Sequence, residues 1–222
     1  METNYQKFLA GEYCNHLDQE VLQMIVQTKN LLARLNATNI TDSATRDALL
    51  RQMLGSIGKY SSIDINFHCE CGKHIFIGDK VIINMNCTLL DAGNIVIGDR
   101  TNIQDGVVLH TIYDKAKHPS QTIIGNDVSV GHNAIIHGAV IGDNCLIGMG
   151  ATLLDNARIP SGCIIAANAL VLSNAQLEPN SVYAGVPAKK VKEVTAEQRE
   201  EIIRRTAHDY MLYASWYGEP EE

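Results

Sequence analysis

Three histidines in the middle of the chain have the residue type and spacing of a metal site. His110 closes the run QDGVVLH, and His132 and His137 stand five positions apart in GHNAIIHG. Imidazole nitrogens bind zinc, cobalt and ferrous iron. Three protein ligands leave a fourth position open for water, which is typical of catalytic rather than structural zinc sites. The pattern predicts a catalytic Zn2+ site, with Fe2+ or Co2+ as other ions that it could accept.

These histidines lie within a six-residue repeat that predicts how the chain folds. Steps of six meet an aliphatic residue at eight of nine positions, and small residues stand two places before the later ones. A helix has a period of 3.6 and a strand a period of 2, so neither explains the pattern. Three hexads instead form one turn of a triangular coil, with turns about 4.8 Å apart. The main track is Ile123, Ser129, Ile135, Ile141, Ile147, Leu153, Ile159, Ile165 and Val171; the small residues are Ala139, Cys145, Ala151, Ala157, Cys163 and Ala169; two shorter tracks are Ile77, Ile83, Leu89 and Ile97, Ile103, Leu109.

The repeat resembles the hexapeptide-repeat family over roughly residues 72–176. That family folds as left-handed parallel β-helices. The predicted fold class is therefore an all-β left-handed parallel β-helix with helices at both ends. We expect three parts: a helical cap over residues 1–58, the coil over 59–190, and a C-terminal helix within 191–222 that packs on the coil.

The flanking segments have the apolar spacing of helices, which would cap the open ends of the coil. Residues 18–35 and 41–54 predict two helices before the coil. Thr195 and Gln198 form a capping-box pattern that opens a final helix extending to about Tyr213. The side chains of this helix expected to face the coil are Ile202, Ile203, Tyr210 and Tyr213.

The coil geometry predicts which histidines meet within one chain. His110 follows Leu109 by one residue and His137 follows Ile135 by two, and both belong to the third hexad of successive turns. Their imidazoles should stack about 4.8 Å apart. His132 lies five residues before His137, about 16 Å along an extended chain, and cannot join them. Packing around a three-fold axis would bring His132 to the neighbouring subunit's pair, so the site predicts a homotrimer.

Composition sets outer bounds on function. The 222 residues carry a formal net charge of -7, and no stretch approaches the length of about 20 apolar residues needed to cross a bilayer. We expect no membrane span and no nucleic-acid partner. The six cysteines are too sparse for a disulfide scaffold, and Met1 precedes polar residues, so we expect free thiols and a cytoplasmic location. These cysteines are Cys14, Cys69, Cys71, Cys87, Cys145 and Cys163.

The remaining histidines are interpreted as structural. The run HCECGKH contains Cys69 and Cys71, which an extended strand would direct to one face without further ligands. We therefore favour packing over a soft-metal site. The histidines in this group are His16, His68, His74, His118 and His208.

Residues 1 to about 99 resemble the sugar O-acetyltransferases of the maltose and galactoside type, through FLAGEYCNHLDQE and GSIGKYSSIDINFHCECGKHIFIGDK. The resemblance implies acetyl transfer from acetyl-coenzyme A to a sugar. The family's catalytic histidine falls at Asp114, with His118 as a shifted substitute, and its tryptophan falls at Ser129. Asn84 and Asp91 are either sugar-contact residues or turn residues.

From Arg100 onward the chain resembles gamma-class carbonic anhydrases, through RTNIQDGVVLH, VSVGHNAIIHG, IGDNCLIGMGATLLD and VYAGVPAKKV. The resemblance implies reversible hydration of carbon dioxide to bicarbonate by hydroxide, formed from zinc-bound water whose pKa is about 7. It implies that Gln104 orients the hydroxide, that Asn102 helps to position it, and that Asp105 lies at the subunit boundary. The implied zinc ligands are His110, His132 and His137.

The sequence departs from that family where an Arg-Gly-Asp motif is expected. Leu89, Leu90 and Asp91 occupy the three positions, so the interface arginine is missing. We expect Asp91 and Asp105 to be left unpaired at the trimer interface, with at least one raised pKa. The two resemblances meet near residues 97–99, as in a natural hybrid or an engineered chimera. Three hypotheses follow: a zinc-dependent lyase, a sugar acetyltransferase, and a catalytically weak trimeric metal-binding scaffold.

Overall fold

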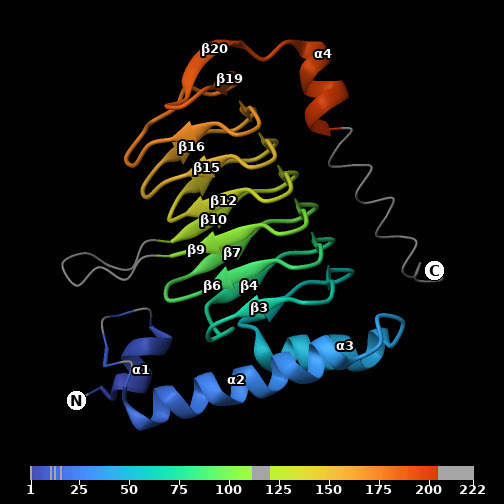
Figure 1. Ribbon diagram of the computed structural model, residues 1–222, viewed down its shortest axis with the longest axis vertical. Helices are drawn as coiled ribbons and strands as arrows, with labels where there is room; N and C mark the ends of the chain where they lie inside the picture. The colour runs from blue at the N-terminus through green and yellow to red at the C-terminus, as the bar shows by residue number, and fades with distance from the viewer. Residues whose placement is uncertain (1, 11, 13, 16, 112–120, 205–222) are drawn as a thin grey trace.

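The computed structural model describes the chain except residues 1, 11, 13, 16, 112–120 and 205–222. Short strands wind into a parallel β-helix with three flat sheets of six, eight and six strands. Figure 1 shows the stacked turns standing on helices α2 and α3, with β19 and β20 at the opposite end. The left-handed parallel β-helix predicted from the period of six is confirmed.

From β1 to β18, each sheet collects every third strand, which is the order that a triangular coil requires. All neighbours pair in parallel except β19 and β20, which are antiparallel. The first sheet contains β1 (Ser56–Ile57), β4 (Ile75–Ile77), β7 (Ile95–Ile97), β10 (Thr122–Ile124), β13 (Val140–Ile141) and β16 (Arg158–Ile159). The second contains β2 (Ser62–Ile63), β5 (Ile82–Ile83), β8 (Asn102–Ile103), β11 (Ser129–Val130), β14 (Leu146–Ile147), β17 (Ile164–Ile165), β19 (Ser181–Ala184) and β20 (Lys189–Glu193). The third contains β3 (His68–Cys69), β6 (Thr88–Leu90), β9 (Val108–His110), β12 (Ile135–His137), β15 (Thr152–Leu153) and β18 (Leu170–Val171).

The inward track differs from the prediction in one turn. Ile124, Val130 and Ile136 are buried there, whereas Ile135 is 39% exposed and faces outward. The predicted track is correct from Ile141 onward, where every member is buried. The step from Ile136 to Ile141 is five residues, so one corner is a residue shorter than the repeat. Because side chains alternate across a strand, this single-residue slip exchanges inside and outside.

Three helices cover the first turn of the coil: α1 (Asn4–Leu9), α2 (Gln19–Ala37) and α3 (Ser43–Met53). The predictions at residues 18–35 and 41–54 are confirmed, with Asp18 and Asp42 as N-caps that accept backbone N–H groups. Helix α1 was not predicted.

A buried arginine fixes the helical cap to the coil. Arg46 of α3 is 5% exposed and donates to the carbonyl oxygens of Leu35 and Thr38 at the end of α2. It also donates to the carbonyl oxygen of Ile63 in β2, at 2.7 Å. The cation thus links two helices and the first turn of the coil through hydrogen bonds to backbone carbonyl groups.

At the other end, the predicted capping box of Thr195 and Gln198 is confirmed. It opens helix α4 (Ala196–Gln198), which continues as a π-helical segment (Arg199–Arg204). Ile203 packs with Ile164 and Val194, so this segment covers part of the second sheet. The side chain of Ile202, together with Tyr210 and Tyr213, lies outside the described residues. None of the described helices is both long and apolar enough to span a membrane.

Candidate metal centre

His110 and His137 lie side by side at the ends of two neighbouring strands. They are partners in the register of β9 and β12, and their ring centroids are 4.5 Å apart. The Nδ1 atom of His110 is 2.6 Å from the Nε2 atom of His137. The predicted stacking is confirmed, but its basis changes: each histidine follows its buried residue, Leu109 or Ile136, by one position.

The environment of His110 favours a neutral imidazole. Burial lowers the pKa of His110, and the neighbouring His137 lowers it further. The carboxylates of Glu70 and Asp155 oppose the shift more weakly. A neutral ring retains the lone pair that a metal ion needs.

Asp155 is hydrogen-bonded to Nδ1 of His137, the ring nitrogen that does not face His110. The Nδ1 atom of His137 is 2.9 Å from Oδ1 of Asp155, and both side chains are 25% exposed. A carboxylate only accepts, so the neutral ring carries its hydrogen on Nδ1 and presents the Nε2 lone pair towards His110.

His132 occupies the corner between β11 and β12. Its Nδ1 atom is 2.8 Å from Oδ2 of Asp105, and its backbone N–H donates to Oε1 of Gln104 at 3.2 Å. Asn133 forms the corner with a φ of 57°, and a Cβ on Gly106 would lie 2.3 Å from the Asn133 Oδ1 atom. Glycine at 106 therefore permits the close stacking that aligns Asp105 with His132.

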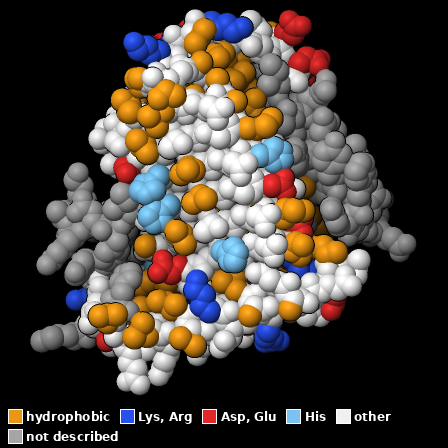
Figure 2. Space-filling model, viewed as in Figure 1, with side chains coloured by type: hydrophobic (Ala, Val, Ile, Leu, Met, Phe, Trp, Pro, Cys, Tyr) orange, Lys and Arg blue, Asp and Glu red, His pale blue; other side chains and the backbone are white. Residues whose placement is uncertain are grey.

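The three histidines do not converge within one chain. Among the described residues, no three histidine, cysteine or acidic groups lie close enough to hold a metal ion. His132 precedes β12 and His137 ends it, so the two side chains belong to opposite ends of one strand segment. Figure 2 shows histidine side chains near both edges of one face of the coil. A three-histidine site would therefore need residues from two chains.

Gln104 and Asn102 form a buried hydrogen-bonded pair beside the His132 corner. Gln104 Nε2 donates to Asn102 Oδ1 at 3.3 Å, and Asn102 Nδ2 donates to the hydroxyl of Ser129 at 2.7 Å. Asn102 and Ser129 are each 1% exposed. Asn102 thus contacts Gln104 rather than open space, and one hydrogen of the Gln104 amide remains available.

Comparison with known proteins identifies the family to which this chain belongs. Residues 121–155 match the family described as bacterial transferase hexapeptide (six repeats), and residues 7–58 match the maltose acetyltransferase hexapeptide capping motif. A carbonic anhydrase of Geobacillus kaustophilus is 42% identical over 64% of this chain and 76% of its own length. The chain belongs to the hexapeptide-repeat superfamily.

Other relatives of this hexapeptide-repeat protein are acetyltransferases. The galactoside O-acetyltransferase of Escherichia coli is 23% identical over 95% of this chain and 97% of its own length. A crystal structure of a hexapeptide-repeat acetyltransferase of Vibrio cholerae complexed with acetyl coenzyme A has a TM-score of 0.65 and 27% identity. It covers 87% of this chain and all of the Vibrio chain. The relatives therefore include both carbonic anhydrases and acetyltransferases.

The assignment of Leu89 to an interface position is wrong. Leu89 is fully buried in the coil of this hexapeptide-repeat protein, between Cys69 and Leu109 in the strand register. The outward side chains of β6 are Thr88 and Leu90, which are half-buried, and neither is an arginine. An arginine at position 89 would have to lie in the core.

The expectation of two unpaired carboxylates is also wrong. Asp91 is fully buried and accepts the backbone N–H groups of Glu70, Cys71 and His74 at 3.1, 2.9 and 3.3 Å. Asp105 is paired with His132. Asp91 is therefore a turn residue that organises the loop after β3.

The raised pKa of Asp91 predicts a pH-dependent stability. Burial raises this pKa to about 6, while backbone hydrogen bonds and His74 oppose the shift. The folded state then keeps the proton up to about pH 6, whereas the unfolded chain loses it near pH 4. Asp91 therefore stabilises the fold below pH 4, and this contribution is lost as pH rises through 6. The shift corresponds to about 3 kcal/mol.

Asp91→Asn removes this titration. The unfolding free energy of the variant, minus that of the native chain, should rise by up to about 3 kcal/mol between pH 4 and 7 in urea titrations. Asp47→Asn, in the exposed pair with Arg51, is the matched control and should show no such rise. A difference that stays flat with pH would show that Asp91 titrates normally.

Both cysteines and the last histidine of the run HCECGKH are packed in the core, whereas His68, which begins β3, is exposed. Cys69 and Cys71 are buried thiols whose pKa values are raised by burial, and none of the six cysteines forms a disulfide bond. His74 is 1% exposed and stacks on Phe8 at 4.5 Å. Asn84 follows β5, with its Oδ1 atom buried and without a described partner. His16, Asp114, His118 and His208 lie outside the described residues.

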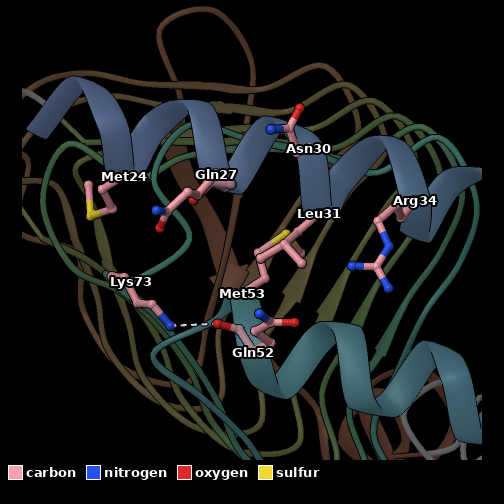
Figure 3. Close-up of a pocket in the computed structure, with 9 residues that line it drawn as sticks. Met24, Gln27, Asn30, Leu31, Arg34, Gln52, Met53 and Lys73 are labelled. Carbon is pink, nitrogen blue, oxygen red and sulfur yellow. Dashed lines mark hydrogen bonds between the residues drawn. The ribbon is translucent and has the colours of Figure 1, made fainter.

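A separate hollow lies between α2 and α3. It has a volume of about 240 Å³, with Met24, Leu31 and Met53 among its lining residues (Figure 3). Lys73 Nζ donates to the backbone oxygen of Gln52 at 2.7 Å, so this cation joins α3 to the loop before β4. The described residues that line the hollow include none of the six predicted site residues.

Proposed function

We propose that this protein catalyses the reversible hydration of carbon dioxide to bicarbonate, using zinc bound between the subunits of a homotrimer. His110 and His137 of one subunit and His132 of its neighbour would bind the ion. The observation that carries the proposal is the pairing of the His110 and His137 rings, whose centroids are 4.5 Å apart, with His132 held at the opposite end of the same strand segment.

The donor atoms fit such an ion. Histidines that bind metals donate their other ring N–H to a carboxylate or carbonyl group, which fixes the tautomer. His137 has Asp155 in this role and His132 has Asp105. The lowered pKa of His110 keeps its ring neutral. Three imidazoles suit zinc, and they also accept cobalt or ferrous iron.

The chain's own residues would supply orientation and exclusion of water. Zinc, when bound, lowers the pKa of water to about 7. Gln104 is fixed through its carbonyl by His132 N–H and through its amide by Asn102, so its remaining amide hydrogen can orient an attacking oxygen or a bicarbonate oxygen. Leu90 neighbours His110 in the strand register and supplies an apolar wall on that side.

Sugar acetylation from acetyl-coenzyme A is the second candidate. The helical cap favours it, because residues 7–58 match the maltose acetyltransferase capping motif and the similarity to galactoside O-acetyltransferase spans nearly the whole chain. Ser129, which aligns with the family's tryptophan, is buried against Asn102 and offers no exposed aromatic surface. A catalytically weak metal-binding trimer is the third candidate.

Metal analysis, mass determination and a carbon dioxide hydration assay on the purified protein test the proposal. We expect a trimer with one zinc ion per chain and hydration that stops when a chelator removes the metal. A metal-free trimer would contradict the proposal. Metal without hydration would favour the metal-binding scaffold, and acetylation of a galactoside or of glucose would favour the transferase.

A further inference from the structure

We infer that Asp155 is a positioning residue for the metal centre, which holds His137 in the tautomer that directs its Nε2 lone pair at the ion. The inference rests on the proposed metal site. It assigns a role to a residue one full turn of the coil after His137, outside the runs that contain the three histidines.

Backbone hydrogen bonds to the adjacent turns fix the corner that contains Asp155 and so orient its carboxylate. The N–H of Leu154 donates to Val171 at 3.0 Å, and the N–H of Asn156 donates to Gly138 at 2.8 Å. The carbonyl of Asp155 accepts the N–H of Asn174 at 2.8 Å. The corner is therefore tied to the turn before it and to the turn after it. A carboxylate presented from such a corner loses little freedom when it binds an imidazole.

The two stacked histidines depend on Asp155 unequally. Among the described contacts, Nδ1 of His137 binds the carboxylate of Asp155, whereas the His110 ring contacts His137 itself. Asp155 thus orients His137 directly and His110 through it. Loss of the carboxylate would free both rings of the pair, while leaving His132 with its own partner Asp105.

Asparagine at position 155 would keep the size of the side chain but change its hydrogen bonding. Its amide can donate as well as accept, so the ring of His137 could adopt the tautomer with hydrogen on Nε2. In that tautomer the lone pair lies on Nδ1 and faces residue 155, so Nε2 has none to offer to the ion. Removal of such supporting carboxylates reduces metal affinity by roughly 10-fold to 100-fold.

Asp143 offers a matched control in another corner of the coil, between β13 and β14. It follows the buried Ile141 by two residues, as Asp155 follows Leu153, and its Oδ1 accepts the backbone N–H of Asn126 at 2.7 Å. Asp143→Asn therefore makes the same chemical change at an equivalent corner that has no described contact with a histidine.

The test compares the native chain with Asp155→Asn, Asp155→Glu and Asp143→Asn. Zinc affinity is measured by competition with a chelator, and the tautomer of His137 is measured by nitrogen NMR on the metal-free protein. Asp155→Asn should weaken zinc binding roughly 10-fold to 100-fold and shift His137 towards the Nε2–H form. Asp155→Glu should restore part of the affinity, and Asp143→Asn should match the native chain in both measurements.

Native zinc affinity and native His137 resonances in Asp155→Asn would overturn the inference, whatever the catalytic activity. A native chain that binds zinc but does not hydrate carbon dioxide would overturn the proposed function and leave the role of Asp155 standing. A native chain that binds no zinc would overturn the role at a metal centre together with the site itself.

Discussion

His132→Ala should weaken zinc binding by roughly 100-fold or more and abolish measurable hydration of carbon dioxide, because it removes one of three ligands. The fold should survive, since His132 stands at a half-buried corner and its side chain contacts Asp105 rather than the core. Zinc content, measured after dialysis against a weak chelator, gives the first effect, and a stopped-flow pH-indicator assay gives the second. His68→Ala, at an exposed position of β3, is the matched control and should behave like the native chain.

A mixing experiment tests whether the site is shared between chains. If His132 serves the neighbour's pair, subunits carrying His132→Ala and subunits carrying His137→Ala should complement one another. Each mixed trimer then contains one interface with all three native histidines, so up to about one third of native zinc content and activity returns. Either variant alone restores none. Mixed trimers as inactive as their parents would contradict a site between subunits.

The repeat made the arrangement of the histidine pair predictable. A period of six specifies flat strands and corners whatever the side chains do outside, and the strand spacing then places His110 beside His137. The prediction survived an error of one residue in phase at Ile135, because both histidines lie next to a buried residue of neighbouring strands. The one-residue shift could not be detected in the sequence. Positions 135 and 136 are both isoleucine, so hydrophobicity does not show which of the two side chains faces inward.

The carboxylates that hold the histidines were harder to predict. The family resemblance placed Asp105 at the subunit boundary, but its contact with His132 depends on how two corners stack, which spacing alone does not specify. The spacing of Asp155 could have indicated its role, because it lies eighteen residues, or one turn of the coil, after His137. Alignment to a motif assigned Asp91 wrongly to an interface, because the loop after β3 folds over its carboxylate.

Leu89→Arg should unfold the coil rather than restore an interface. The side chain at position 89 has no exposed surface and packs between Cys69 and Leu109, so a guanidinium there would be buried without a carboxylate partner. The expected loss of unfolding free energy is at least about 4 kcal/mol, from burial of an unpaired charge and overpacking. Chemical denaturation followed by circular dichroism measures it, and accumulation of the variant as insoluble protein is the expected extreme.

Two control substitutions, Thr88→Arg and Leu89→Met, distinguish the effect of burying a charge from the effect of changing residue 89. Thr88→Arg puts the same side chain on the same strand, but at an outward position, and should change the unfolding free energy by no more than about 1 kcal/mol. Leu89→Met keeps the volume of the buried residue without the charge and should cost less than about 1.5 kcal/mol. If Leu89→Arg were as stable as Thr88→Arg, residue 89 would face outward. The register that aligns Leu90 with His110 would then be wrong, and the apolar wall proposed for the metal centre would be lost with it.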